Sequence, residues 1–188
     1  MKNAPAIITK IVHVLAALLV VLLLAQVAML FLPSLTVTPK ESKVNPNPQP
    51  TDYTFMEYCW TATEDVSEGL EQIIKKYNVN DYVVGFVLSM FFAVLTVVFT
   101  IMETIYTITK YKTGGATTIR ILAYVTGFAW AYFAIPCFFS NPIFKYTNDT
   151  GAMVQSVCQI LAVAGLAVVA VRMVLALLAK FAFKKKVA

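Results

Sequence analysis

Charged residues are scarce in this chain. They account for 13% of the 188 residues, against about 25% in an ordinary soluble domain, while 59% of the residues are apolar and the mean hydropathy is +0.73. So few charges cannot cover the surface of a domain in water, which excludes a water-soluble enzyme. The length allows one domain or one compact membrane bundle.

Histidine and cysteine are also rare, and this limits metal and redox chemistry. A single histidine, His13, excludes a bis-histidine haem and argues against a histidine-rich metal site. The three cysteines form no Cys-x-x-Cys pair, so a thiol oxidoreductase has no anchor. The sequence has no Ser/His/Asp set, glycine-rich phosphate loop or pair of acids suited to catalysis. We therefore predict no enzyme, no cofactor and no metal.

Long apolar runs are what the sequence does contain. Four of them have about the 20 residues needed to cross a membrane, at residues 11–32, 82–102, 121–140 and 152–172. Such runs must be helices, because lipid offers no partners to the backbone polar groups. The first run is longer than the apolar part of a signal peptide, so we expect it to be retained. The predicted fold is a single all-α domain over residues 1–188, a bundle of four transmembrane helices.

The basic residues predict an orientation for this bundle. Ten of the 15 lie on the side shared by both termini and the second loop, and the tail at residues 180–188 is among them. Nine of the ten acids lie on the other side. The positive-inside rule then places both termini in the cytoplasm, in a plasma membrane or a bacterial inner membrane. The basic tail predicts anionic lipid headgroups as partners, and no nucleic acid.

The outer loop, residues 33–80, is the largest predicted part outside the membrane. Its prolines predict a stiff polyproline-type spacer, and residues 64–77 have the pattern of an amphipathic helix. Between these segments lies an aromatic cluster, which either rests at the level of the lipid headgroups or docks a partner. Its members are Tyr53, Phe55, Tyr58 and Trp60.

This layout resembles claudin-type and other tetraspan proteins, which share four spans, internal termini and a large first outer loop. The claudin loop signature, Gly-Leu-Trp followed by two spaced cysteines, is absent, and Cys59-Trp60 does not replace it. The resemblance therefore carries over no residue and no function.

All three cysteines fall in the outer half, where Cys59 could form a disulfide with Cys137; the alternative is free thiols.

Polar residues inside the spans are costly in lipid and therefore informative. The second helix carries a polar stripe on one face, formed by Ser89, Thr96, Thr100 and Thr107. Small and hydroxyl-bearing stripes allow helices to pack closely in a membrane, and the same stripe could line a path for a solute.

Four charged or titratable residues match in depth, because each lies about 20 residues in from the outer end of its span. They are His13, Glu103, Arg120 and Arg172. We expect them to converge, with Glu103 pairing with at least one arginine. One positive charge is then left over, so Arg172 snorkels to the interface, shares Glu103 or binds an anion such as a phospholipid phosphate.

These observations favour a non-enzymatic membrane protein, an assembly, accessory or scaffolding subunit. Its partner would be another membrane or extracellular chain, or a second copy, bound through the outer loop and the small-residue helix faces. The alternative is a small transporter or channel lined by the polar stripe. A water-wide cavity past Ser89, Thr96 and Thr100 would favour transport, whereas dry packing would favour assembly.

Overall fold

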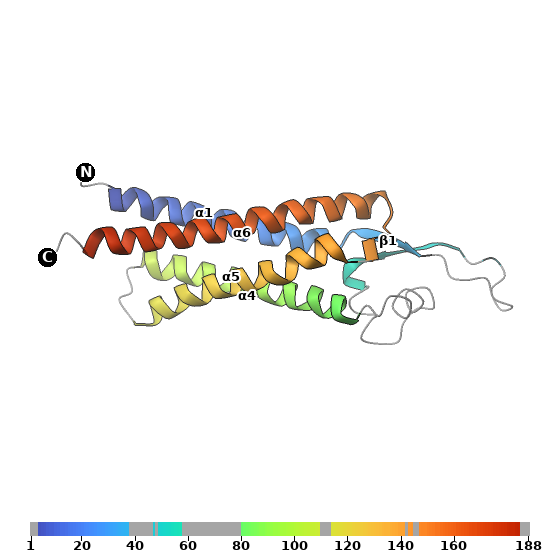
Figure 1. Ribbon diagram of the computed structural model, residues 1–188, viewed down its shortest axis with the longest axis horizontal. Coiled ribbons are helices and arrows are strands. Elements are labelled where there is room, and N and C mark those ends of the chain that lie inside the picture. The colour runs from blue at the N-terminus through green and yellow to red at the C-terminus, as the bar shows by residue number, and fades with distance from the viewer. Residues whose placement is uncertain are drawn as a thin grey trace.

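The computed structural model is a bundle of four long helices with a small two-stranded sheet at one end (Figure 1). It describes residues 4–37, 47, 49–57, 80–109, 114–141, 143–144 and 147–184. The elements are α1 (Ala4–Met29), β1 (Pro33–Val37), β2 (Thr51–Thr54), α4 (Asn80–Ile108), α5 (Gly114–Ser140) and α6 (Asp149–Lys184). Each helix is long and apolar enough to cross a membrane, which indicates an integral membrane protein.

The helices extend beyond the predicted apolar runs. The largest difference is in α6, whose 36 residues correspond to about 54 Å of helix, well over the roughly 30 Å of a hydrocarbon core. Hydropathy marks the part of a helix that lies in lipid, whereas polar residues can continue the same helix outside it. Helix α5 likewise begins at Gly114, seven residues before the predicted run at residues 121–140.

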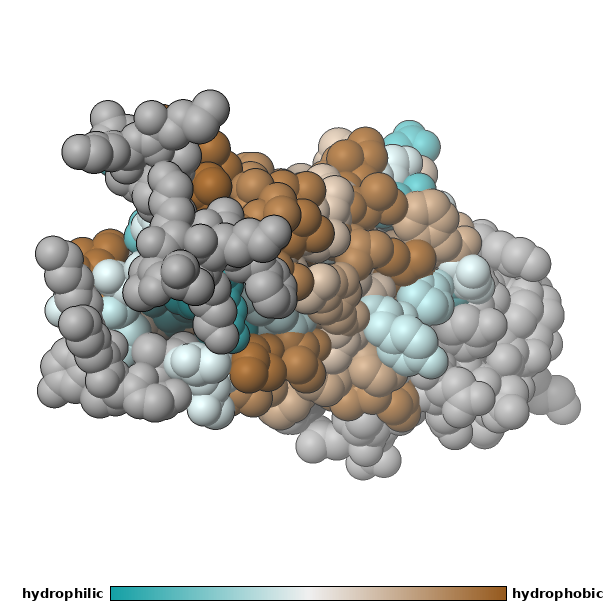
Figure 2. All heavy atoms as spheres, turned by 60° about the vertical axis from the view of Figure 1, so that its left-hand side comes forward, coloured by the Kyte–Doolittle hydropathy of each residue, from teal (hydrophilic) through white to brown (hydrophobic). Residues whose placement is uncertain are grey.

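The bundle has two unlike ends. Figure 1 shows the N-terminal end of α1 and the C-terminal end of α6 at the same end of the molecule, together with the adjoining ends of α4 and α5. The strands lie at the opposite end. Helix α4 packs most extensively on α5, and α1 packs on α6. The middle of the visible face is a belt of apolar side chains, with hydrophilic residues gathered towards the ends (Figure 2).

Residues 33–37 and 51–54 of the outer loop pair as a small sheet, while most of the proline-rich segment predicted to be a polyproline-type spacer lies outside the described residues. Strands β1 and β2 pair antiparallel, and Leu35 lies opposite Tyr53. Leu35 is fully buried, while the backbone carbonyl of Ser34 accepts a hydrogen bond from the amide of Asn148 at 3.2 Å. The strand is thus held against the start of α6, a long-range contact that no local pattern encodes. The helix predicted at residues 64–77 lies outside the described residues.

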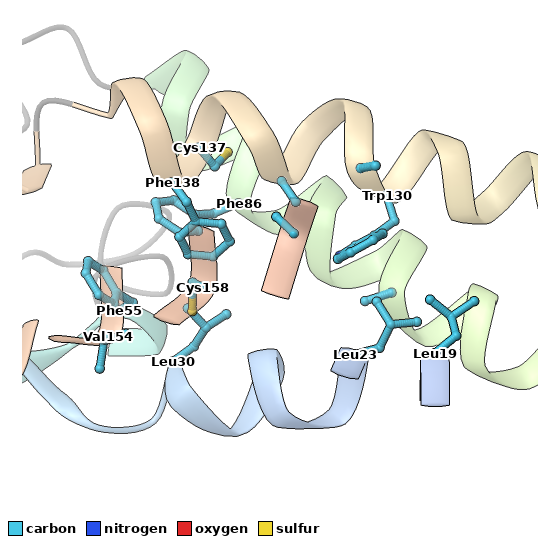
Figure 3. Packing of buried hydrophobic residues seen from close by; sticks show 14 of the residues in the cluster. Leu19, Leu23, Leu30, Phe55, Phe86, Trp130, Cys137, Phe138, Val154 and Cys158 are labelled. Atoms are coloured by element: carbon cyan, nitrogen blue, oxygen red, sulfur yellow. The ribbon is translucent and has the colours of Figure 1, made fainter. Parts of the chain in front are cut away.

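Aromatic and aliphatic side chains fill the interior along the length of the bundle. In Figure 3 Trp130 points from α5 towards Leu19 and Leu23 of α1. Near the sheet, the ring of Phe86 on α4 lies edge to face with Phe138 on α5, with centroids 5.5 Å apart. These contacts join all the layers of the bundle into one core.

The small residues face inwards. A Cβ on Gly85 of α4 would lie 2.8 Å from the sulfur of Cys137 on α5, and one on Gly127 of α5 would lie 3.0 Å from Val169 on α6. Both glycines therefore allow close packing between helices of this chain.

Candidate functional site

Glu103 forms ion pairs with two arginines from two other helices. Its Oε1 lies 2.9 Å from Nε of Arg120 on α5, and its Oε2 lies 2.7 Å from Nη2 of Arg172 on α6. Glu103 itself is on α4 and is only 4% exposed. The three residues that the sequence expected to converge are thus in direct contact, because the antiparallel helices bring equal depths together.

The two arginines differ strongly in burial. The side chain of Arg120 is 44% exposed, whereas that of Arg172 is 1% exposed. The guanidinium of Arg172 lies over the ring of Tyr124, with Cζ 5.5 Å from the centroid. The Tyr124 hydroxyl also donates a hydrogen bond to the backbone carbonyl of Arg172 at 3.4 Å. Arg172 therefore shares Glu103 and does not snorkel to the interface, so the prediction of snorkelling is wrong.

The hydrogen-bonding capacity of Arg172 is incompletely used. Its Nε and Nη1 are buried and have no hydrogen-bond partner among the described residues. One carboxylate faces two guanidiniums, so the cluster keeps a net charge of about +1. A buried donor without a partner costs roughly 1–3 kcal/mol, and more when it is charged. Two buried N–H donors of Arg172 are therefore left without an acceptor among the described residues.

A cavity of about 100 Å³ lies against this cluster, and we call it the charged pocket. All four helices contribute to it. Its lining is Ile8, Thr9, Val12 and His13 from α1, Glu103, Thr104 and Thr107 from α4, Arg120 from α5, and Arg172, Ala176 and Ala179 from α6. The half-buried His13 thus borders the same space as the three charged residues, at the end of the bundle where α1 begins and α6 ends.

The polar stripe of α4 is packed inside the bundle over most of its length. Ser89, Thr96 and Thr100 are buried, and the Thr96 hydroxyl donates to the carbonyl of Phe92 at 2.7 Å. Only Thr107 is half-exposed, and it lines the charged pocket. The hydroxyl of Thr100 has no partner in the described part of the chain.

The predicted aromatic docking cluster is split by the structure. Phe55 is fully buried, with its ring stacked on Phe86 at 5.8 Å and edge to face with Phe144 at 5.2 Å. It belongs to the core and cannot dock a partner. Tyr53 is half-buried, while Tyr58 and Trp60 lie outside the described residues.

The structure describes one of the two cysteines in the predicted disulfide between Cys59 and Cys137. Cys137 is a buried free thiol, packed against the α4 backbone at Gly85, and Cys59 lies outside the described residues. Cys158 is likewise a buried free thiol. The sulfur of Cys137 is thus directed into the bundle and not towards the outer loop.

A second buried polar contact was missed from the sequence. Trp130 on α5 donates its indole N–H to Oε1 of Gln26 on α1 at 2.9 Å, and the Gln26 amide donates to the carbonyl of Cys158 on α6 at 3.5 Å. The one signal available was a glutamine inside a run of apolar residues. Its partners, 104 and 132 residues away, could not be identified without the fold.

An open apolar groove of about 360 Å³ lies on the surface along α5 and α6 near mid-span. Its lining is Phe128, Ala131, Tyr132, Ile135, Pro136 and Leu166. Tyr132 is 74% exposed, and within the described residues its hydroxyl makes no hydrogen bond. Neither this groove nor the charged pocket is lined by Ser89, Thr96 or Thr100.

Comparison with protein-family models, with curated proteins and with solved structures finds no match to this chain. Among the described residues, no group of three or more His, Cys, Asp or Glu side chains is placed to hold a metal ion. The features from which we infer a function are therefore the bundle, the charged pocket and the groove beside Tyr132.

Proposed function

We propose that this protein is a non-enzymatic integral membrane protein that assembles with another membrane-spanning chain. The observation that carries the proposal is the position of Tyr132. It lies eight residues, or about 12 Å, from Ser140 at the end of its span, with a bare hydroxyl beside an apolar groove. A polar group in hydrocarbon without a partner costs free energy, so this face favours contact with another helix over contact with lipid.

The partner of this face is a transmembrane helix with a hydrogen-bond acceptor near mid-depth. Its apolar side chains would fill the groove between Phe128 and Leu166, and its acceptor would receive the Tyr132 hydroxyl. A second copy of this chain meets the same description. The burial of Ser89, Thr96 and Thr100 supports assembly over the alternative of a small transporter or channel, because the stripe that would line a solute path is used for packing.

Site-specific photocrosslinking tests this assembly in the native membrane. A benzophenone amino acid at Phe128, which lines the groove beside Tyr132, should crosslink to a protein, while the same group at Val94 on α4, an exposed apolar position at mid-span outside the groove, should not. Tyr132→Phe should weaken recovery of the crosslinked partner by about threefold, since one hydrogen bond between helices is worth roughly 0.6 kcal/mol. Crosslinks to lipid alone at both positions would contradict the proposal.

The orientation is part of the same proposal. Ten of the 15 basic residues belong to the two termini and the second loop, on the side where α1 begins and α6 ends. By the positive-inside rule this end faces the cytoplasm. The membrane is then a plasma membrane or a bacterial inner membrane. In a Cys59→Ser background, Lys180→Cys should react with an impermeant maleimide only after the membrane is opened, whereas Thr51→Cys should react in intact cells. The reverse order of labelling would refute this topology.

A further inference from the structure

The feature with the strongest unmet chemistry is the guanidinium of Arg172. It is buried at 1% exposure, held on one nitrogen by Glu103, and without a hydrogen-bond partner on Nε and Nη1 among the described residues. The cavity beside it is lined by apolar side chains such as Val12 and Ala176 as well as by the charged residues. A buried cation with free donors next to an open volume is a binding site for an anion.

Other donors face the same volume. Among the described residues Arg120 is bound to Glu103 through Nε only, which leaves its two Nη groups without a partner there, and the ring of His13 likewise has no hydrogen-bond partner. Glu103 is the one acid among the pocket residues, and both of its oxygens are already bound to arginines. The excess of about one positive charge is therefore confined to the pocket wall.

We infer that the charged pocket binds a phosphate group, with Arg172 as its buried donor and Arg120 as its outer donor. The unpaired N–H groups belong to two side chains on different helices, and both side chains line the pocket. A phosphate has several acceptor oxygens arranged around one atom and can accept from all of these donors, whereas a carboxylate offers two oxygens in one plane. The volume of about 100 Å³ exceeds the roughly 10–15 Å³ required by one water, so it has room for a larger anion.

The depth of the pocket fits the phosphate of a lipid headgroup. Glu103 lies five residues before Ile108 and Arg120 three residues after Thr117, which places both within about 8 Å of the ends of their spans. Lipid phosphates lie at this boundary of the hydrocarbon core. A free phosphate ion would use the same donors, so the experiment separates the two sources. The site is formed by all four helices at one end of the bundle and does not depend on the groove beside Tyr132.

The test uses the full-length protein in a mild detergent, with binding measured by native mass spectrometry and by the shift in thermal unfolding. The probes are phosphatidylglycerol, phosphatidylcholine and inorganic phosphate, each with chloride at equal ionic strength. Ala179→Phe fills the pocket from α6 without changing any charge, and Val12→Phe does so from α1. Ala167→Phe is the matched control, because Ala167 is exposed on another face of α6.

We expect phosphatidylglycerol to bind and to raise the unfolding temperature of the native protein and of Ala167→Phe. Both pocket-filling variants should bind about tenfold more weakly or not at all, as expected for the loss of hydrogen bonds to a charged group. Saturation by phosphatidylglycerol without an effect of inorganic phosphate identifies the lipid as the source, and the opposite pattern identifies a free phosphate. If none of the three probes binds, or if Ala179→Phe and Val12→Phe bind as well as Ala167→Phe, the inference is overturned.

Discussion

Trp130 of α5 occupies the space that the missing side chain of Gly165 leaves on α6. A Cβ at position 165 would lie 2.7 Å from Cζ3 of the indole, well inside the usual carbon–carbon contact of about 3.5–4.0 Å. Because Trp130 is fully buried and its N–H is fixed by Gln26, the ring has no free direction in which to move. The pair sets the distance between two helices near the middle of the bundle.

Gly165→Ala should therefore destabilise the protein by about 1–3 kcal/mol, the usual cost of overpacking a core. The measurement is unfolding in mixed detergent followed by circular dichroism. In a Trp130→Phe background the smaller ring should relieve the clash, so the same substitution should cost less. A gain in stability on Gly165→Ala, as helix propensity alone would give, would contradict this assignment.

Removing the central acid should be far more damaging than removing the exposed arginine. Glu103→Gln leaves the buried Arg172 without its counter-charge and should cost about 3–5 kcal/mol. Arg120→Gln should cost about 0–1 kcal/mol, since that side chain is 44% exposed and is screened by water. Thermal unfolding of the two variants in one detergent measures the difference. Equal stabilities would mean that the cluster does not hold the helices together.

The contact between Gln26 and Trp130 should behave as a coupled pair. Gln26→Leu leaves the indole N–H of Trp130 unpaired in the core and should cost about 1–3 kcal/mol. Gln26→Leu combined with Trp130→Phe removes both partners, and it should cost clearly less than the sum of the two single changes. A double-mutant cycle on unfolding free energies measures this coupling. Additive single effects would show that the hydrogen bond contributes nothing.

The two buried thiols should resist labelling. In a Cys59→Ser protein, Cys137 and Cys158 should not react with a maleimide until the bundle is unfolded, because both lie in the core. Mass spectrometry before and after denaturation counts the labels, and two should be added only after denaturation. Rapid labelling of the folded protein would mean that the interface of α4 and α5 at Gly85 is open to reagents.

Sequence reasoning was most successful where the physics is local. The apolar runs had to become helices because lipid leaves backbone groups no other partner, and four helices long and apolar enough to span a membrane are present. Equal depth along antiparallel helices was also sufficient to anticipate that Glu103, Arg120 and Arg172 would meet. Both arguments need only the length and spacing of residues along each span.

The tertiary structure alone decided the contacts that join distant parts of the chain. The burial of Phe55 against Phe86 placed one member of the expected docking cluster in the core, and the pairing of β1 with β2 joined two segments of the outer loop. Burial also separated two arginines that look alike in the sequence, since Tyr124 and the surrounding helices enclose Arg172 while Arg120 stays half-exposed. Which side chain is enclosed depends on how the helices rotate about their axes as they pack. That rotation is set by the sum of many contacts between helices, and no single span encodes it.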